Sequence, residues 1–297
     1  MTVFTAYEDV TLRGGPIRLY RAGPAIGPPT VLLHGAMYDT APLLWRDVMP
    51  ALAADRDVVA IDLPRHGGSR PWTGVLDQPR LEEVLAALLD HVGADRADLV
   101  GLSMGAGLAI GFALNHPDRV RGLVAAAPGG IEETRPWQFL TWLFLRPALL
   151  RWSAALLAAS PGLLRRSMIR SLAAGDRTPG FEQIMELVRA EAEAKRRDGD
   201  LALDDWQITA YGPRRMRLNH LPRLPGLAVP SLWIYGRQDT LVGEETMRRA
   251  VAATPGAHLE IIEDAGHLSP LDRPDVFTGL VRSFLARLDA DQTSTAG

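Results

Sequence analysis

Short apolar runs alternate with helical patterns along much of the chain, and this alternation limits its fold more than any other feature. Thr30–Leu33 and Leu99–Leu102 are rich in Val and Leu, which is typical of short strands buried on both faces of a sheet. The helical pattern Met104–Asn115 directly follows the second run. Strands separated by helices of this length pair in parallel through right-handed crossovers. We therefore expect an α/β protein in which helices cover both faces of a mostly parallel sheet.

The alternation stops at residue 131 and resumes after residue 222. Only helical patterns occur between these positions. The length of 297 residues also exceeds the usual domain size of about 100–150 residues. We therefore expect residues 1–130 and 223–297 to form one α/β core, and residues 131–222 to form a helical cap inserted into it.

The other expected elements follow the same criteria of periodicity, length and flanking Gly or Pro. The further strands are a hairpin of Val10–Leu12 and Ile17–Tyr20, then Val58–Ile61, Gly122–Ala127, Ser231–Tyr235 and His258–Ile262. The further helices are Pro42–Ala54, Leu81–Val92, Trp137–Leu157, Leu163–Ala174, Phe181–Arg197, Glu244–Ala253 and Val276–Leu288.

The composition narrows the chemistry available to the chain. It contains no cysteine, which excludes disulfides, thiolate metal sites, iron–sulfur clusters and a cysteine nucleophile. Hydrophobic residues make up 47% of the chain, enough to bury a sizeable core. The formal net charge is −3 and no basic stripe marks a nucleic-acid surface. Lys195 is the only lysine, and its charged neighbours Arg196, Arg197 and Asp198 indicate a solvated helix end.

Neither a signal peptide nor a membrane span is expected. The first nine residues lack a basic start and an apolar stretch. The most apolar candidate for a span, Trp137–Ala159, is interrupted by Arg146, Pro147 and Arg151. We expect a cytoplasmic protein, monomeric or homodimeric, that acts on a small hydrophobic molecule and has neither a nucleic-acid partner nor a stable membrane insertion.

Ser103 lies in Gly101-Leu102-Ser103-Met104-Gly105, a G-x-S-x-G pattern between a buried strand and a helix. A residue at such a turn is held in a strained conformation, and the flanking glycines allow strand and helix to approach. Its hydroxyl projects at the carboxyl edge of the sheet, where ligands of open α/β sheets bind. A phosphate-binding or merely tight glycine turn is the alternative, and the strand–helix context favours a nucleophile.

A serine nucleophile needs a base to take its proton and an acid to orient that base. His267 stands in a loop just beyond the last expected strand, which can return to the mouth of the sheet. Asp239 follows Ser231–Tyr235 at the same carboxyl edge, so we expect it to be the acid. Glu132 and Glu133, after the preceding core strand, are the alternatives.

The loop His34-Gly35-Ala36-Met37 follows the first core parallel strand and is a candidate for oxyanion stabilisation. The backbone N–H of Ala36 can meet that of Met104, which gives two donors for a developing negative charge. Met37 is the alternative first donor. His34 is then expected to shape the loop and not to act as a base.

The order Ser103, Asp239, His267, together with His34-Gly35 and Asp62-Leu63-Pro64-Arg65-His66-Gly67, resembles the α/β-hydrolase superfamily. The resemblance covers nearly the whole chain. It implies a mostly parallel eight-stranded sheet with a helical cap after the sixth strand. It also implies a serine triad with an oxyanion hole, and neither a cofactor nor a metal.

Within this superfamily, haloalkane dehalogenases and epoxide hydrolases carry aspartate at the position of Ser103. Hydrolysis of a small-to-medium hydrophobic carboxylic ester, lactone or thioester is the broadest match. Carbon–carbon bond hydrolysis of a vinylogous diketone is an alternative, although the enzymes that perform it usually carry a longer glycine/proline oxyanion motif than His34–Met37. A non-hydrolytic ligand-binding role is a third possibility.

The expected cap is rich in tryptophan. Trp137, Trp142 and Trp206 are candidates for lining a hydrophobic substrate pocket under its helices. The alternative is that these side chains only pack the cap onto the core.

Overall fold

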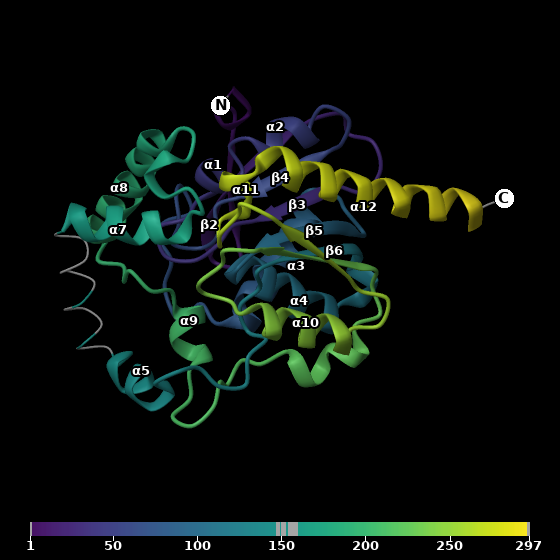
Figure 1. Cartoon of the computed structure of the whole chain (residues 1–297). Helices are drawn as coiled ribbons and strands as arrows, with labels where there is room; N and C mark the ends of the chain where they lie inside the picture. Colours follow the sequence, from purple (N-terminus) through teal and green to yellow (C-terminus); the bar gives the residue numbers. More distant parts are fainter. Residues whose placement is uncertain (1, 147–148, 150–152, 154–159, 296–297) are drawn as a thin grey trace.

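The computed structural model describes residues 2–146, 149, 153 and 160–295, and its centre is an eight-stranded sheet (Figure 1). The strand order is β1-β2-β4-β3-β5-β6-β7-β8. β2 pairs antiparallel with β1 and β4, and all other neighbouring pairs are parallel. The expected mostly parallel α/β sheet is thus confirmed. The strands are β1 Glu8–Leu12, β2 Gly15–Ala22, β3 Thr30–Leu33, β4 Val58–Ile61, β5 Ala97–Leu102, β6 Val120–Ala126, β7 Ser231–Gly236 and β8 His258–Ile262.

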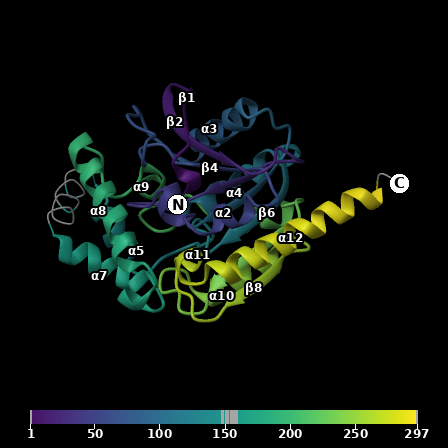
Figure 2. The same cartoon turned by 90° about the horizontal axis from the view of Figure 1, so that it is seen from above.

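Helices cover both faces of the sheet (Figures 1 and 2). One face carries α3, α4 and α10, and the opposite face carries α2 and α12. These and the two short neighbouring helices span α1 Ala41–Leu44, α2 Val48–Leu52, α3 Gln78–His91, α4 Met104–Asn115, α10 Glu244–Ala253, α11 Ser269–Asp272 and α12 Pro274–Thr295. Short 3₁₀ turns occur at Thr2–Phe4, Pro117–Arg119, Gly175–Arg177 and Leu221–Gly226.

Several expected helices differ in their bounds from the observed ones, among them Pro42–Ala54 and the last helix. Pro42–Ala54 is divided into α1 and α2, because Pro50 in one continuous helix would clash with the carbonyl of Arg46 and lack its N–H. The last helix runs on to Thr295, beyond the expected end at Leu288.

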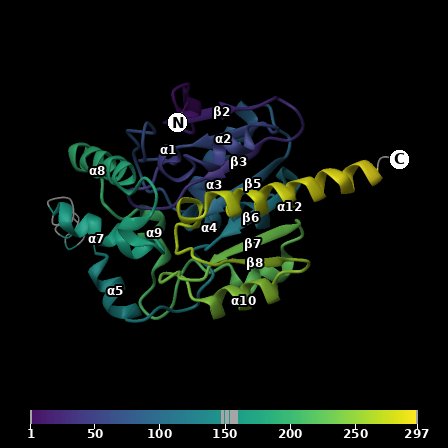
Figure 3. The ribbon, with the colours of Figure 1, turned by 45° about the horizontal axis from the view of Figure 1, so that its top comes forward.

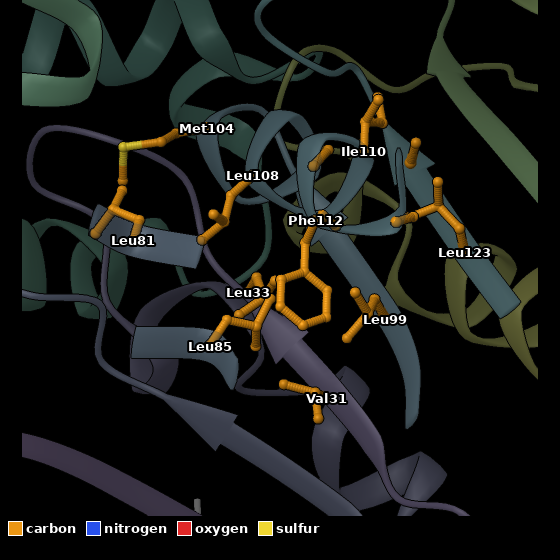
Figure 4. Packing of buried hydrophobic residues seen from close by; sticks show 14 of the residues in the cluster. Val31, Leu33, Leu81, Leu85, Leu99, Met104, Leu108, Ile110, Phe112 and Leu123 are labelled. Carbon is orange, nitrogen blue, oxygen red and sulfur yellow. The ribbon is translucent and has the colours of Figure 1, made fainter. Parts of the chain in front are cut away.

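Alternate residues of the central strands supply the two layers of the core. Val31 and Leu33 of β3 belong to the cluster that includes α3 and α4, whereas Leu32 belongs to the cluster on the α2 and α12 side. Figure 4 shows Val31, Leu33 and Leu85 close to the ring of Phe112, which α4 supplies. Side chains that alternate between two apolar layers explain why the strand is apolar at successive positions. The core therefore holds the carboxyl ends of the parallel strands in fixed positions.

Helices dominate the chain between β6 and β7. They are α5 Gln138–Phe144, α7 Pro161–Ser171, α8 Phe181–Asp198 and α9 Asp205–Ala210, and they gather at one end of the sheet (Figures 1–3). The expected helix Trp137–Leu157 is represented by α5, and most of its remainder lies outside the described residues. None of the helices in the described part of the chain is long and apolar enough to cross a membrane.

Candidate active site

Ser103 occupies a sharp turn between β5 and α4. Its backbone has φ 53° and ψ −111°, a conformation that non-glycine residues rarely adopt. Hydrogen bonds hold this turn in place: Ser103 N donates to Ala126 O at 2.9 Å, and Ser103 O accepts from Gly107 N and Gly129 N at 2.9 and 3.0 Å. The surrounding backbone thus maintains a strained position for the serine hydroxyl.

The two glycines that flank Ser103 allow close approach of backbone segments. A Cβ on Gly105 would lie 2.2 Å from the carbonyl oxygen of Leu33 in β3. A Cβ on Gly101 would lie 2.5 Å from the N atom of Ala106 in α4. No side chain fits at either position, because both neighbours are backbone atoms. The G-x-S-x-G pattern is therefore a packing requirement of the turn that presents Ser103.

Asp239 and His267 form a hydrogen-bonded pair at the carboxyl edge of the sheet. Nδ1 of His267 lies 2.8 Å from Oδ2 of Asp239. The other oxygen of Asp239 accepts hydrogen bonds from Leu241 N at 2.7 Å and Val242 N at 3.1 Å, and its side chain is fully buried. These contacts fix the carboxylate so that the imidazole keeps its Nδ1 proton and leaves Nε2 as an acceptor.

The alternative acids are placed differently. Glu132 forms an ion pair with Arg135, and Glu133 is exposed. In the described part of the chain, no hydrogen bond or ion pair joins either side chain to His267, so the geometry favours Asp239 for this position.

A cavity of about 140 Å³ is lined by both Ser103 and His267. No hydrogen-bond partner occupies His267 Nε2 among the described residues, so this nitrogen is available to a hydroxyl in the cavity. The apolar part of the wall comes from the loop after β3, from α7 and α8, and from further residues around the sheet edge. It consists of Ala36, Met37, Tyr38, Leu43, Leu102, Leu164, Met168, Val188, Leu241, Leu268 and Leu271.

The structure does not place the three candidate tryptophans at this cavity. Trp137 is 78% exposed, and Trp142 contacts the ring of Phe139 at a centroid distance of 5.8 Å. Trp206 is buried, and its Nε1 donates to Gln78 Oε1 at 2.5 Å. The expectation of a tryptophan-lined pocket is corrected accordingly: the described lining residues include no tryptophan, and the apolar part of the wall is mainly aliphatic.

The loop after β3 lies beside Ser103 and contains the candidate oxyanion donors. Met104 is the first residue of α4, so its N–H has no partner within the helix. Nothing in the described part of the chain accepts a hydrogen bond from Ala36 N. Met37 N, in contrast, donates to Asp204 Oδ2 at 2.7 Å. The geometry therefore favours Ala36 and Met104 over the alternative with Met37.

His34 has the structural environment that the sequence suggested. Its Nε2 accepts a hydrogen bond from Leu63 N at 2.9 Å, and Nδ1 lies 2.7 Å from Gly35 O. Burial lowers the pKa of His34 well below its usual range, which keeps the ring neutral. It joins two loops at the edge of the sheet and is not a candidate base.

Asp39 is a feature of the cavity wall that the sequence did not reveal. Its Oδ2 accepts from Gly35 N at 2.7 Å and its Oδ1 from Thr40 N at 2.9 Å. Burial raises the pKa of Asp39 to about 7, although both hydrogen bonds act in the opposite direction. The only sequence signal for Asp39 is its position five residues after His34. That position does not show whether the carboxyl group lines a cavity or only stabilises a turn.

Lys195 also differs from expectation. Lys195 is 2% exposed, and its Nζ donates to Asp204 Oδ1 at 2.8 Å. The expected solvated helix end is therefore wrong at this residue, because α8 turns Lys195 toward the core. His66 Nε2 approaches the same carboxylate oxygen at 3.0 Å. Both contacts depend on how α8 and α9 pack, which local sequence patterns do not encode.

The model of the alpha/beta hydrolase fold family matches residues 28–274, and the chain belongs to this family. It is an enzyme of the α/β-hydrolase class.

Among its curated relatives, the chain is 29% identical over 269 residues to a 2-hydroxymuconate semialdehyde hydrolase of Pseudomonas putida, which covers 89% of each chain. It is 27% identical over 271 residues to a pimeloyl-[acyl-carrier protein] methyl ester esterase of Aeromonas hydrophila, covering 87% of this chain and 96% of the relative. Among solved structures, a thermophilic esterase from Thermogutta terrifontis superposes with a TM-score of 0.75 at 25% identity, over 95% of this chain and 99% of that one.

Proposed function

We propose that the protein is a serine hydrolase that cleaves small-to-medium hydrophobic carboxylic esters, lactones or thioesters through an acyl-enzyme. The observation that carries this proposal is the Asp239–His267 hydrogen bond at a cavity that Ser103 also lines. A strained serine, an imidazole with an available nitrogen and a buried carboxylate together supply a nucleophile, its base and the group that orients the base.

In this mechanism, His267 Nε2 takes the proton of the Ser103 hydroxyl as the oxygen attacks the ester carbonyl. The negative charge that develops on the carbonyl oxygen is stabilised by the N–H groups of Ala36 and Met104. His267 then donates its proton to the departing alcohol, which leaves an acyl group on Ser103. A water molecule, deprotonated by the same nitrogen, attacks the acyl group and restores the serine.

The size and wall of the cavity indicate the acyl group. A dry aliphatic cavity of about 150 Å³ is large enough for a benzene ring, and this cavity of about 140 Å³ has a mainly aliphatic wall. We infer a preference for short apolar acyl groups. In this proposal residues 131–222 act as the cap, since α7 and α8 provide Leu164, Met168 and Val188.

Carbon–carbon bond hydrolysis is the second candidate, and the similarity to a 2-hydroxymuconate semialdehyde hydrolase supports it. Against it, the described cavity wall includes the carboxyl of Asp39 and neither Arg nor Lys. A muconate-type substrate carries a carboxylate, which such a wall does not neutralise. A non-hydrolytic ligand-binding role is the third candidate.

Initial rates on p-nitrophenyl acetate, butyrate and octanoate, compared with a ring-fission dienoate, separate these candidates. We expect turnover of the short esters and a decline toward octanoate. Ser103→Ala should lower ester turnover by on the order of 10³-fold or more while the circular dichroism spectrum stays unchanged. Faster turnover of the dienoate than of any ester would favour the second candidate, and no Ser103-dependent turnover of either would favour the third.

A further inference from the structure

Asp204 connects the helices between β6 and β7 to the loop that carries the candidate oxyanion donor. It directly precedes α9, and its Oδ2 accepts the hydrogen bond from Met37 N at 2.7 Å. Its Oδ1 accepts from Lys195 Nζ at 2.8 Å and lies 3.0 Å from His66 Nε2. We call Asp204, Lys195 and His66 the Asp204 cluster.

The Asp204 cluster is buried, which makes a purely stabilising role an insufficient explanation. Lys195 is 2% exposed and His66 is fully buried. Removing such charges from water costs several kcal/mol per ion, and their mutual attraction often does little more than offset this cost. Lys195 is the only lysine in the sequence, and every other basic side chain that is always charged is an arginine. The one compact side-chain ammonium group of the chain therefore lies at this carboxylate.

His66 gives the cluster a second contact with the same loop. Its Nδ1 lies 2.8 Å from the carbonyl oxygen of Asp39, which can only accept a hydrogen bond. Its Nε2 faces the carboxylate of Asp204, which accepts as well. Both ring nitrogens of His66 are therefore occupied by acceptor groups of the protein. The cluster thus holds the loop at Met37 N and at Asp39 O.

These contacts bear directly on the orientation of Ala36. The Met37 N–H lies in the peptide plane that follows Ala36, so anchoring it fixes the backbone on the C-terminal side of Ala36. Gly35 N, on the other side, is held by Asp39 Oδ2 at 2.7 Å. Ala36 is bracketed by two hydrogen bonds from backbone N–H groups to side-chain carboxyl groups, while its own N–H remains available.

We propose that Asp204 is a positioning residue for the oxyanion hole: it holds Met37 N, and thereby aims Ala36 N–H at the reacting oxygen only when α8 and α9 are seated on the core. This inference rests on the proposed hydrolase function. Burial by itself would raise the pKa of Asp204, but the charges of Lys195 and His66 lower it below its usual range. Asp204 therefore stays ionised at working pH and keeps its full strength as an acceptor.

The neighbouring residue provides a matched control. Asp205 also joins this segment to the core, through Arg65 Nη1 at 2.6 Å and Leu76 N at 3.0 Å. It has no hydrogen bond to residues 34–39. Asp205→Ala therefore removes a contact of similar type that holds the same segment, without touching the oxyanion loop.

The test compares wild type, Asp204→Ala, Asp204→Glu and Asp205→Ala with a short p-nitrophenyl ester and with a trifluoromethyl ketone, whose hemiketal oxyanion uses the same donors. In Asp204→Ala we expect kcat to fall by about 10–100-fold with KM within threefold, and the ketone to bind more weakly by a similar factor. Asp204→Glu should recover part of the loss, and Asp205→Ala should keep both values within about threefold. If Asp204→Ala does not fold by circular dichroism, Asp204→Asn replaces it, with the same direction expected.

Two results overturn the proposal while leaving the hydrolase function intact. One is an Asp204 variant that keeps kcat and ketone affinity within twofold of an active wild type. The other is an equal loss in Asp205→Ala, which would show that only general docking of the segment matters. A wild type that turns over no ester and binds no ketone would instead overturn the proposed function and this inference with it.

Discussion

Two aspartate–histidine pairs lie close to the candidate active site, and they differ in what their histidines can do. His267 lines the cavity, whereas Asp204 holds Met37, a residue of the cavity wall. In the pair Asp239–His267, the aspartate holds Nδ1 at 2.8 Å and Nε2 has no partner among the described residues. In the pair Asp204–His66, both ring nitrogens are engaged, by the carboxylate and by the Asp39 carbonyl. The first arrangement leaves one ring nitrogen available to a substrate or to a serine hydroxyl, whereas the second leaves neither.

The difference shows that residue types alone do not define a proton-transfer site. Asp204 carries a second cation, Lys195, while the other oxygen of Asp239 is occupied by two backbone N–H groups. Backbone donors fix a carboxylate without adding charge, so they leave the imidazole free to gain and lose a proton. In the Asp204 cluster, the carboxylate instead contacts the ammonium group of Lys195 and the ring of His66, whose two nitrogens both have hydrogen-bond partners. This arrangement forms a static polar network.

The largest expected effect separates the two histidines. His267→Gln should lower ester turnover by on the order of 10⁴-fold or more with little change in melting temperature, because it removes the proposed base. His66→Gln should lower turnover far less, by about tenfold, and destabilise the fold by about 1–3 kcal/mol through its buried partners. Steady-state kinetics and thermal melts of both variants check this. Equal kinetic losses would contradict the distinction between the pairs.

The next effect concerns the orienting acid. Asp239→Asn should lower turnover by on the order of 10³-fold, because an amide can donate to Nδ1 and then favours the wrong imidazole tautomer. Asparagine is nearly isosteric with aspartate, so it should fit the buried site of the Asp239 side chain. Initial rates of ester hydrolysis at pH 7 measure this loss, and a loss below tenfold would contradict the role of Asp239 as the orienting acid.

A smaller effect, on stability, is expected from Asp39. Asp39 lines the cavity together with His267, and its backbone carbonyl contacts His66. Because burial raises its pKa to about 7, the folded protein retains a proton that the unfolded chain loses above about pH 4. Stability is therefore lost as the pH rises from about 4 to about 7. Asp39→Asn should remove this loss, so its advantage over wild type should grow over that window to a few kcal/mol.

Denaturant melts at pH 4.5, 6 and 8 measure this trend. Asp95→Asn, at an exposed position, is the control and should show no such growth. An advantage of Asp39→Asn that stays constant with pH would contradict the assigned protonation of Asp39.

The smallest effect on turnover is expected for Glu132 and Glu133, the alternative candidates for the orienting acid. Glu132→Gln and Glu133→Gln should each change ester turnover by no more than about twofold, since Glu132 pairs with Arg135 and Glu133 is exposed. Both variants are measured beside Asp239→Asn. A tenfold loss in either would reopen the choice of acid.

The parts of the site that the sequence predicted are those set by local structure. Ser103, Asp239 and His267 each follow a strand, and the carboxyl ends of parallel strands meet at one edge, so strand patterns suffice to bring them together. The Asp204 cluster and the aliphatic cavity wall arise from helices packing across the sheet edge. Met37 and Asp204 are 167 positions apart in sequence. No periodicity or motif records such a contact, and tryptophan content was a misleading guide to the cavity.

We propose Ser103 as the nucleophile, and mass spectrometry of the trapped enzyme can identify the residue that reacts. The wild-type protein is treated with a fluorophosphonate, digested and mapped, beside Ser103→Ala and a heat-denatured sample. We expect one adduct per chain, on the peptide that contains Ser103, and no adduct in either control. An adduct on another residue, or ester turnover by a protein that remains unlabelled, would contradict it.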